Sequence, residues 1–223
     1  MAIAWSYSKL NAFETCARRF YLTTVTKQVY EPQTAATLWG NQVHKALELR
    51  VGKGQALPDT MKQFEPVAAS IAAKRDTGAK IEVEQKLALN GKLQPTTWFG
   101  KDVWVRGITD VTITKGDTAV VLDYKTGKPT PDSAQLRLTA AMTFAHKPYV
   151  NTVVNSFLWL KTGDKPTTEI IKRDQLHEIW QEFAPRVRRM EIAHEEEKFP
   201  PKPSGLCRKW CPVGKALCEH CGE

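Results

Sequence analysis

Two aspartates and a lysine near the middle of the chain are side chains of the kind that bind a divalent cation and stabilise a phosphate. Asp123 and Lys125 close the apolar run of residues 119–122. Because side chains alternate along a strand, both should project from one face. The run around Asp110 also has a strand pattern, and the two runs flank Gly116 and Asp117. Glycine in the first central position predicts a two-residue type II′ turn, and therefore a tight hairpin.

This hairpin should bring the two aspartates together. If Lys115 pairs with Thr118, the same register places Asp110 directly opposite Asp123, with Cβ atoms about 5 Å apart. Like charges at that distance need a cation, a shared proton or a nearby base. A divalent cation such as Mg²⁺ binds through one or two carboxylates and leaves room for water and a substrate phosphate. The predicted chemistry is hydrolysis at a phosphate, with Lys125 stabilising the developing charge.

A surface hairpin with Asp123 and Lys125 as solvated charges is the alternative interpretation of this triplet. Asp123 ends an apolar run, however, and a lone carboxylate is costly to bury without a partner. Together with the facing Asp110, this position favours the metal site.

The five cysteines form a second group with chemical potential. Four of them lie in the last 17 residues, at Cys207, Cys211, Cys218 and Cys221, and Cys16 stands near the start. An odd number in this arrangement argues against a disulfide framework and favours a metal site. The tail spacing, C-x3-C-x6-C-x2-C, suits either zinc or an iron-sulphur cluster.

Composition and charge set the broad class. The chain has 223 residues, of which 42% are hydrophobic and 25% charged, which excludes a disordered or fibrous protein. Its formal charge of +8 favours a polyanionic partner but supports nucleic acid only weakly. No apolar run approaches the roughly 18 residues of a membrane span, and the first residues lack a basic segment followed by an apolar one. We therefore expect a soluble, unexported, cytoplasmic protein.

Several helices and strands must position these groups. The pattern predicts a helix within residues 6–21, capped by Ser8, and another over residues 37–51, with His44 on one face and Gly52 to Gly54 at its end. The other expected elements are a helical segment within 58–74, strands at 81–89, 101–114, 118–125 and 150–160, and helices at 133–144 and 173–196. This order predicts an α/β or α+β core, followed by a stiff linker at residues 199–205.

Five ordered motifs resemble the PD-(D/E)xK nuclease superfamily, in particular its RecB-like branch, which includes iron-sulphur exonucleases of CRISPR adaptation and of phages. The matching motifs are S-x-S-x-L-x-x-F-x-x-C at residues 6–16, G-x-x-x-H at 40–44, G-x-x-D at 107–110, D-Y-K-T-G-K at 123–128 and Q-L at 135–136. The resemblance covers most of the chain, from Ser6 to Cys218.

The resemblance implies a restriction-endonuclease-like α/β core, in which helices flank a mixed central sheet. A cysteine-rich C-terminal tail would pack on the N-terminal helix. The implied domains are a nuclease core at residues 1–198, and a linker and tail at 199–223 that complete a metal-cluster site.

The resemblance also implies roles for individual residues. His44, Asp110, Asp123 and the main-chain carbonyl of Tyr124 would bind the catalytic Mg²⁺ or Mn²⁺, and Lys125 would be the catalytic lysine. Glu84 matches a glutamate that many members place near the active site, although Glu82 competes for this role because both should point to the same face. Gln135 would support the site or contact DNA. The tyrosine usually found four residues later is Thr139 here, so a role for that position is in doubt.

For the cysteines, the resemblance implies a structural 4Fe-4S cluster on Cys16, Cys207, Cys211 and Cys218. Cys221 would then be a spare thiol, or it could replace Cys218, because the tail spacings are wider than the commonest form. The alternative is a zinc knuckle made of the four tail cysteines without Cys16.

The expected partner is DNA. Arg18, Arg19, Arg188 and Arg189 could line a phosphate track, and Trp5, Tyr7 and Trp210 could stack on unpaired bases. The predicted function is a metal-dependent DNA exonuclease acting on ends. Two alternatives remain: a DNA-end-binding accessory of recombination or adaptation with little nuclease activity, and a zinc-stabilised interaction protein. The sequence leaves open the polarity, the strand preference, the balance of end and internal cutting, the metal, the protein partners and the pathway.

Overall fold

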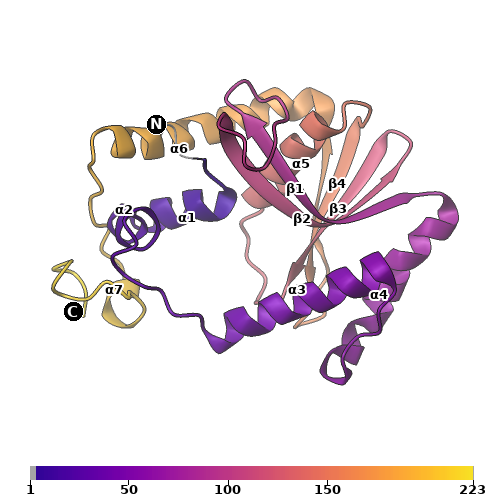
Figure 1. Cartoon of the computed structure of the whole chain (residues 1–223), viewed down its shortest axis with the longest axis horizontal. Helices are drawn as coiled ribbons and strands as arrows, with labels where there is room; N and C mark the ends of the chain where they lie inside the picture. Colours follow the sequence, from indigo (N-terminus) through magenta and orange to yellow (C-terminus); the bar gives the residue numbers. More distant parts are fainter. Residues whose placement is uncertain (1–3, 223) are drawn as a thin grey trace. The chain divides into compact units, whose positions relative to one another are not determined.

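The computed structural model describes residues 4–222, and the chain divides into two compact units (Figure 1). The larger unit is Thr34–Trp180, and the smaller one combines Met1–Gln33 with Gln181–Glu223. Among the described residues, no helix combines the length and the apolar character that crossing a bilayer requires.

A five-stranded mixed sheet forms the centre of the larger unit. Its strands follow the order β1-β2-β3-β4-β5, and only the β3–β4 pair is parallel. The strands are β1 (Lys80–Asn90), β2 (Val103–Lys115), β3 (Thr118–Lys125), β4 (Thr152–Trp159) and β5 (Thr167–Lys172). The sequence pattern predicted the first four. It missed β5, which is a short edge strand where half-buried and exposed residues alternate and Ile171 alone is buried.

The β2–β3 hairpin has the predicted turn and register. Lys115 pairs with Thr118, and the ladder continues without a shift to Val111 opposite Leu122. Gly116 has a φ of +60°, whereas Asp117 is not among the residues with positive φ. This combination fits a type II′ turn and excludes type I′, which needs positive φ at both central positions.

Helix α3 (Ala35–Lys53) covers one face of the sheet (Figure 1). It starts where the Thr34 hydroxyl accepts a hydrogen bond from the Thr37 amide, and it ends at Gly54 in the left-handed conformation, as the sequence predicted. The predicted segment at 58–74 is divided into a 3-10 turn η2 (Asp59–Phe64), helix α4 (Glu65–Ala72) and a 3-10 turn η3 (Ala73–Thr77). These elements and α3 bury an apolar core against β2 and β3 that includes Val43, Leu47, Val51, Val111 and Leu122.

Helix α5 (Ala134–His146) makes the crossover that the parallel β3–β4 pair requires. Leu136 on this helix packs with Phe157 and Trp159 of β4. The buried Asn155 side chain of β4 donates a 2.7 Å hydrogen bond to the Leu136 carbonyl. Helices therefore flank a mixed sheet, and the predicted α/β class is confirmed.

The smaller unit contains both ends of the chain. Its elements are α1 (Tyr7–Thr15), α2 (Ala17–Phe20), a π-helical turn η1 (Tyr21–Val25), residues 181–195 of α6 (Leu176–Glu195) and α7 (Leu206–Lys209). The predicted cap at Ser8 is wrong, because Ser6 accepts the hydrogen bond from the Lys9 amide. The predicted continuous helix is also interrupted, because Cys16 adopts an extended conformation with φ −163° and ψ 110°.

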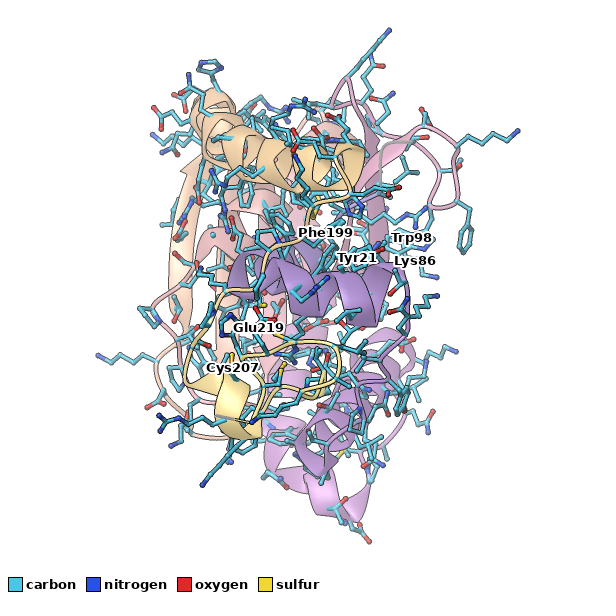
Figure 2. All side chains as sticks on the ribbon, turned by 90° about the vertical axis from the view of Figure 1, so that its left-hand side faces the viewer. Tyr21, Lys86, Trp98, Phe199, Cys207 and Glu219 are labelled. Atoms are coloured by element: carbon cyan, nitrogen blue, oxygen red, sulfur yellow. The ribbon has the colours of Figure 1, made fainter. Side chains whose placement is uncertain are left out.

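The C-terminal tail packs on the N-terminal helices of the same unit, as expected. The Arg18 amide donates to the Pro200 carbonyl over 3.3 Å, and the Lys202 amide donates to Cys16 Sγ over 3.4 Å. The Tyr21 and Phe199 rings stack with centroids 4.5 Å apart, and Figure 2 shows them together. The linker at 199–205 is thus anchored beside Cys16.

Candidate active site

The carboxyl end of β3 carries the predicted aspartate–lysine pair. Asp123 and Lys125 project from one face of the sheet, and Lys125 Nζ lies 2.8 Å from Asp123 Oδ2. The Lys125 ammonium also lies 4.5 Å from the centre of the Phe157 ring. The sequence did not predict a role for Phe157, because only the parallel pairing of β3 with β4 places it beside Asp123. The pair is partly buried but remains accessible to solvent, since the Lys125 side chain is 28% exposed.

Gln135 in the first turn of α5 holds both members of this pair. Its Nε2 donates to Asp123 Oδ1 over 2.7 Å, and its Oε1 accepts from Lys125 Nζ over 2.9 Å. Asp132 fixes the start of the helix by accepting from the Ala134 amide, and the Thr139 hydroxyl donates to the Gln135 carbonyl. Gln135 therefore fixes the direction of the Lys125 ammonium. Thr139, where the resemblance led us to expect a tyrosine, makes only this side-chain contact with the helix backbone among the hydrogen bonds of the described residues.

Asp110 occupies the place where β2 and β3 separate. The regular ladder stops at Val111, and Asp110 Oδ2 accepts a 2.6 Å hydrogen bond from the Tyr124 amide. Its other oxygen, Oδ1, lies 3.1 Å from Nδ1 of His44 on α3. Asp110 thus connects the sheet to the histidine that the sequence placed on the helix face.

Strand β2 is distorted beside Asp110. The Thr109 and Thr112 hydroxyls lie 3.0 Å apart, although residues three apart in a regular strand point to opposite faces. This irregularity explains how Asp110 reaches His44 on α3 while Asp123, its partner in the predicted register, contacts Gln135 on α5.

Strand β1 supplies a second carboxylate through an unusual backbone conformation. Glu84 has a φ of +49°, a region that is strained for residues other than glycine. Its neighbours Val83 and Gln85 still pair with Val111 and Thr109 of β2. The strained backbone turns the Glu84 carboxylate out of the normal alternation and towards His44 and Asp110.

The competing glutamate has another role. Glu82 forms ion pairs with Lys80 and with Lys147, the residue that follows α5. Glu82 and Glu84 therefore do not share surroundings, although plain alternation along β1 predicted that they would. The structure places Glu84 in the candidate site and Glu82 in a salt-bridge network away from it.

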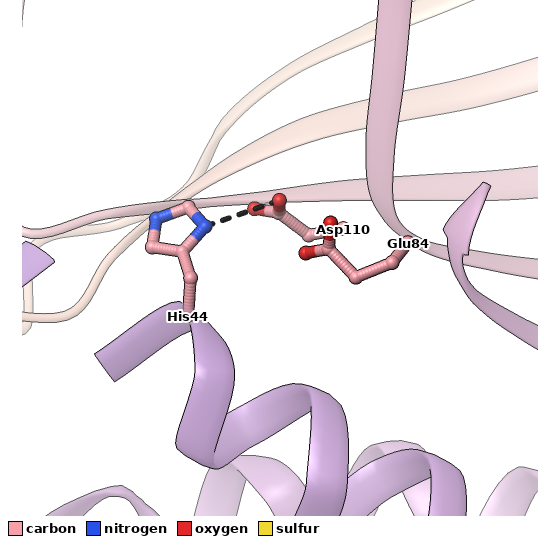
Figure 3. Close-up of side chains that lie close together, drawn as sticks. All are labelled: His44, Glu84 and Asp110. Atoms are coloured by element: carbon pink, nitrogen blue, oxygen red, sulfur yellow. Dashed lines mark hydrogen bonds and ion pairs between the residues drawn. The ribbon is translucent and has the colours of Figure 1, made fainter. Parts of the chain in front are cut away.

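Figure 3 shows the group that can hold a metal ion. One ligand atom from each of His44, Glu84 and Asp110 can be chosen so that all three atoms lie within 4.8 Å of one another. Two carboxylates and an imidazole suit Mg²⁺ or Mn²⁺. Asp123 is not part of this group, and its carboxylate contacts Lys125 and Gln135.

The electrostatics of the site reflect crowded carboxylates. Burial raises the pKa of Asp123 to about 6; Lys125 opposes this rise and the Asp110 charge adds to it. Burial also raises the pKa of Glu84, and the charges of Asp110 and Glu48 act in the same direction. Burial alone would lower the pKa of His44, but the hydrogen bond and charge of Asp110 outweigh it, so that the net shift is upward. A bound cation would relieve this repulsion.

An open cleft of about 530 Å³ gives access to these groups. Its lining includes His44, Glu84, Asp110 and Ile108. A Cβ on Gly40 of α3 would lie 3.1 Å from the Thr126 hydroxyl oxygen, a tight contact that glycine avoids. These two residues belong to the G-x-x-x-H and D-Y-K-T-G-K motifs. The motif glycine therefore lets the helix that carries His44 pass close to the loop after β3.

The five cysteines meet in the smaller unit. All of them line one small pocket, and Cys218 and Cys221 are buried. Burial raises the pKa of the Cys221 thiol to about 12, and hydrogen bonds with Cys211 and Cys218 add to the shift. Cys207 lies on α7 and accepts from the Ser204 amide (Figure 2). Thiols from both ends of the chain thus converge, as a shared metal site requires.

Three of the four predicted DNA-binding arginines form ion pairs within the smaller unit. Arg19 pairs with Glu31, Arg188 with Glu195, and Arg189 with Glu14. Arg18 lines the cysteine pocket.

The stacking role predicted for Trp5 is wrong. Trp5 is 1% exposed and packs against Phe183, with ring centroids 6.0 Å apart. Trp210, by contrast, is 73% exposed and remains accessible.

Comparisons with known proteins place the chain in a nuclease family and give its fold a solved counterpart. The model of the PD-(D/E)XK nuclease superfamily matches residues 4–219. Among solved structures, a "Putative exonuclease" from Eubacterium rectale aligns with a TM-score of 0.54 at 13% identity, covering 92% of this chain and 85% of that one. The structure of SSO0001 aligns with a TM-score of 0.43 at 16% identity, covering 99% of this chain and 88% of that one. No curated protein sequence matches the chain.

Proposed function

The chain belongs to the PD-(D/E)XK nuclease superfamily, and from this membership we propose that it is a divalent-metal-dependent exonuclease that hydrolyses phosphodiester bonds at DNA ends. One observation carries the proposal. A group of side chains on α3, β1 and β2 that can hold a metal ion lies beside a lysine that an aspartate and a glutamine hold in place. A protein that only grips DNA gains nothing from this costly crowding of carboxylates.

His44, Glu84 and Asp110 would hold Mg²⁺ or Mn²⁺, and we propose Asp123 and the Tyr124 carbonyl as further ligands. A bound divalent cation polarises the phosphodiester and lowers the pKa of a bound water. Lys125 places a positive charge where negative charge develops on the phosphate. Gln135 fixes the direction of that ammonium, and the Tyr124 amide fixes Asp110.

We also propose that Cys16, Cys207, Cys211 and Cys218 hold a structural 4Fe-4S cluster, with Cys221 as the alternative to Cys218. The convergence of all five thiols on one pocket supports a site that includes Cys16. Zinc bound by the tail cysteines remains the second candidate, because four thiolates suit either metal. Metal analysis of anaerobically purified protein distinguishes iron from zinc.

Digestion of labelled DNA tests the nuclease. Wild type should degrade end-labelled linear DNA with Mg²⁺ or Mn²⁺, spare closed circles and lose activity in EDTA. Lys125→Ala should be inactive. Lys115→Ala removes an exposed lysine from the far end of the hairpin and should be fully active. If wild type and Lys125→Ala were equally inert yet bound DNA, the accessory function would replace the exonuclease.

A further inference from the structure

The loop between β1 and β2 carries an aromatic and basic surface beside the cleft. The Trp98 ring has two cations close to it: Lys86 Nζ lies 5.7 Å and Arg106 Cζ 5.5 Å from its centre. Figure 2 shows Lys86 and Trp98 next to each other. The adjacent Phe99 is 84% exposed. We call Lys86, Trp98, Phe99 and Arg106 the aromatic platform.

The platform has an excess of positive charge. Within residues 4–222, neither Lys86 nor Arg106 forms an ion pair with a carboxylate. Asp102, an acid of the same loop, accepts from the Thr96 hydroxyl instead. Two like charges near one indole ring repel each other, so an anion bound there would be stabilised by both.

The platform is continuous with the catalytic cleft. Lys86 pairs with Ile108 across the β1–β2 ladder, and Ile108 lines the cleft beside Asp110. Arg106 lies four residues from Asp110 on β2, which corresponds to about 13 Å along a strand. An extended strand bound at the platform would therefore lead directly to the metal-binding group.

We propose that the aromatic platform binds unpaired bases of single-stranded DNA and guides that strand to the active site. The exposed Phe99 ring and the half-buried Trp98 ring offer stacking surfaces to bases of any sequence, and the two cations offer contacts to phosphates. Duplex DNA keeps its bases stacked inside the helix, so the rings favour a single strand. This inference deepens the proposed function, on which it rests, by naming the substrate as a single strand.

Anisotropy measurements in EDTA test the platform without DNA hydrolysis. The probes are one fluorescein-labelled oligonucleotide as single-stranded DNA, as a blunt duplex and as single-stranded RNA. Wild type should prefer single-stranded DNA, and Phe99→Ala and Trp98→Ala should each weaken its binding about tenfold. Lys86→Gln and Arg106→Gln should each reduce the slope of log affinity against log salt by about 0.7.

Two control variants and the exposure of Phe99 keep the result interpretable. Phe99 is almost fully exposed, so its replacement leaves the fold intact, and Trp98→Phe keeps a ring for both packing and stacking. Tyr149→Ala removes an aromatic residue that is 55% exposed outside the platform and should bind like wild type.

Two results would overturn the inference: single-strand affinity unchanged in both ring deletions, or equal weakening for single strand and duplex. Tighter binding of RNA than of DNA would overturn DNA as the occupant. A protein that binds single strands through Trp98 but does not cleave them with metal would refute the exonuclease and leave the platform standing.

Discussion

Replacing Glu84 tests whether β1 is strained in order to supply a metal ligand. Glu84 has a φ of +49° and lies near the Asp110 and Glu48 carboxylates, which help to raise its pKa. A left-handed conformation costs a residue other than glycine about 1–2 kcal/mol. Glycine removes this strain and the charge repulsion, but its freedom in the unfolded chain costs about 0.5–1 kcal/mol. We therefore expect Glu84→Gly to raise the metal-free free energy of unfolding by about 0.5–1 kcal/mol.

The matched control is Glu82→Gly, two residues earlier in the same strand. Glu82 has no positive φ and forms ion pairs with Lys80 and the buried Lys147. Its replacement removes these contacts and adds glycine flexibility, so it should lower stability by about 1–3 kcal/mol. Glu84→Gln, which keeps the strain and loses the charge, should lie between wild type and Glu84→Gly.

Urea unfolding in EDTA and in excess Mn²⁺ measures both effects. A ligand that binds only the folded state stabilises it, by about 2.7 kcal/mol at one hundred times its dissociation constant. Wild type and Glu82→Gly should gain this increment, and both Glu84 variants should lose most of it. The reasoning fails if Glu84→Gly is less stable than wild type in EDTA, or if it keeps the whole Mn²⁺ increment.

The remaining predictions concern other parts of the molecule. Gln135→Met should lower kcat for DNA cleavage about ten- to hundredfold, because the Lys125 ammonium loses the contact that fixes its direction. In a double variant with Lys125→Ala it should add little further loss, and losses that multiply would contradict this role for Gln135. Gly107→Val should lower the free energy of unfolding by about 1–3 kcal/mol, because a Cβ there lies 3.0 Å from Met142 Sδ, and Met142→Ala should restore part of the loss in a double-mutant cycle. Cys16→Ala should lose its metal and unfold at lower temperature; full metal content by elemental analysis would exclude Cys16 as a ligand. Burial lowers the pKa of His146; the Lys147 charge acts in the same direction, and a hydrogen bond with Ala88 opposes both. Because the pKa is lower in the folded state, the unfolded state binds a proton at this histidine more readily. The stability of wild type relative to that of His146→Gln should therefore fall as the pH drops below about 6.5, and denaturation of both proteins at several pH values measures this difference.

The sequence predicted the elements whose local signals agree with their packing. The Gly116 turn and the β-branched runs beside it specified the hairpin and its register. The helix predicted over residues 37–51 follows from its apolar stripe and its glycine end, the structure extends it to Ala35–Lys53, and the stripe placed His44 on one helix face. The resemblance implied that Gln135 supports the site or contacts DNA, and its side chain contacts Lys125.

Other features depend on tertiary interactions that no local signal reports. The strained φ of Glu84 has no glycine or asparagine to mark it, so alternation wrongly grouped Glu84 with Glu82. The break at Cys16 lies inside a good helical pattern, and the bond from the Lys202 amide to its sulphur comes from the other end of the chain. The contacts of Lys86 and Arg106 with the Trp98 ring depend on the pairing of β1 with β2, so the sequence alone did not predict them.

Departures from regular strand geometry gather at the residues that would do the chemistry. Glu84 has a left-handed backbone, Thr109 and Thr112 touch across what should be opposite faces, and the β2–β3 ladder ends before Asp110. A regular sheet would point the Glu84 and Asp110 carboxylates to one side and leave His44 on the other. The distortions bring carboxylates from two strands to a helix on the opposite face, at a cost in stability that the apolar core between α3 and the sheet offsets. A metal site whose ligands come from both a sheet and a helix thus requires backbone strain at this edge of the sheet. A substitution that relieves the strain should stabilise the protein and, at the same time, weaken metal binding.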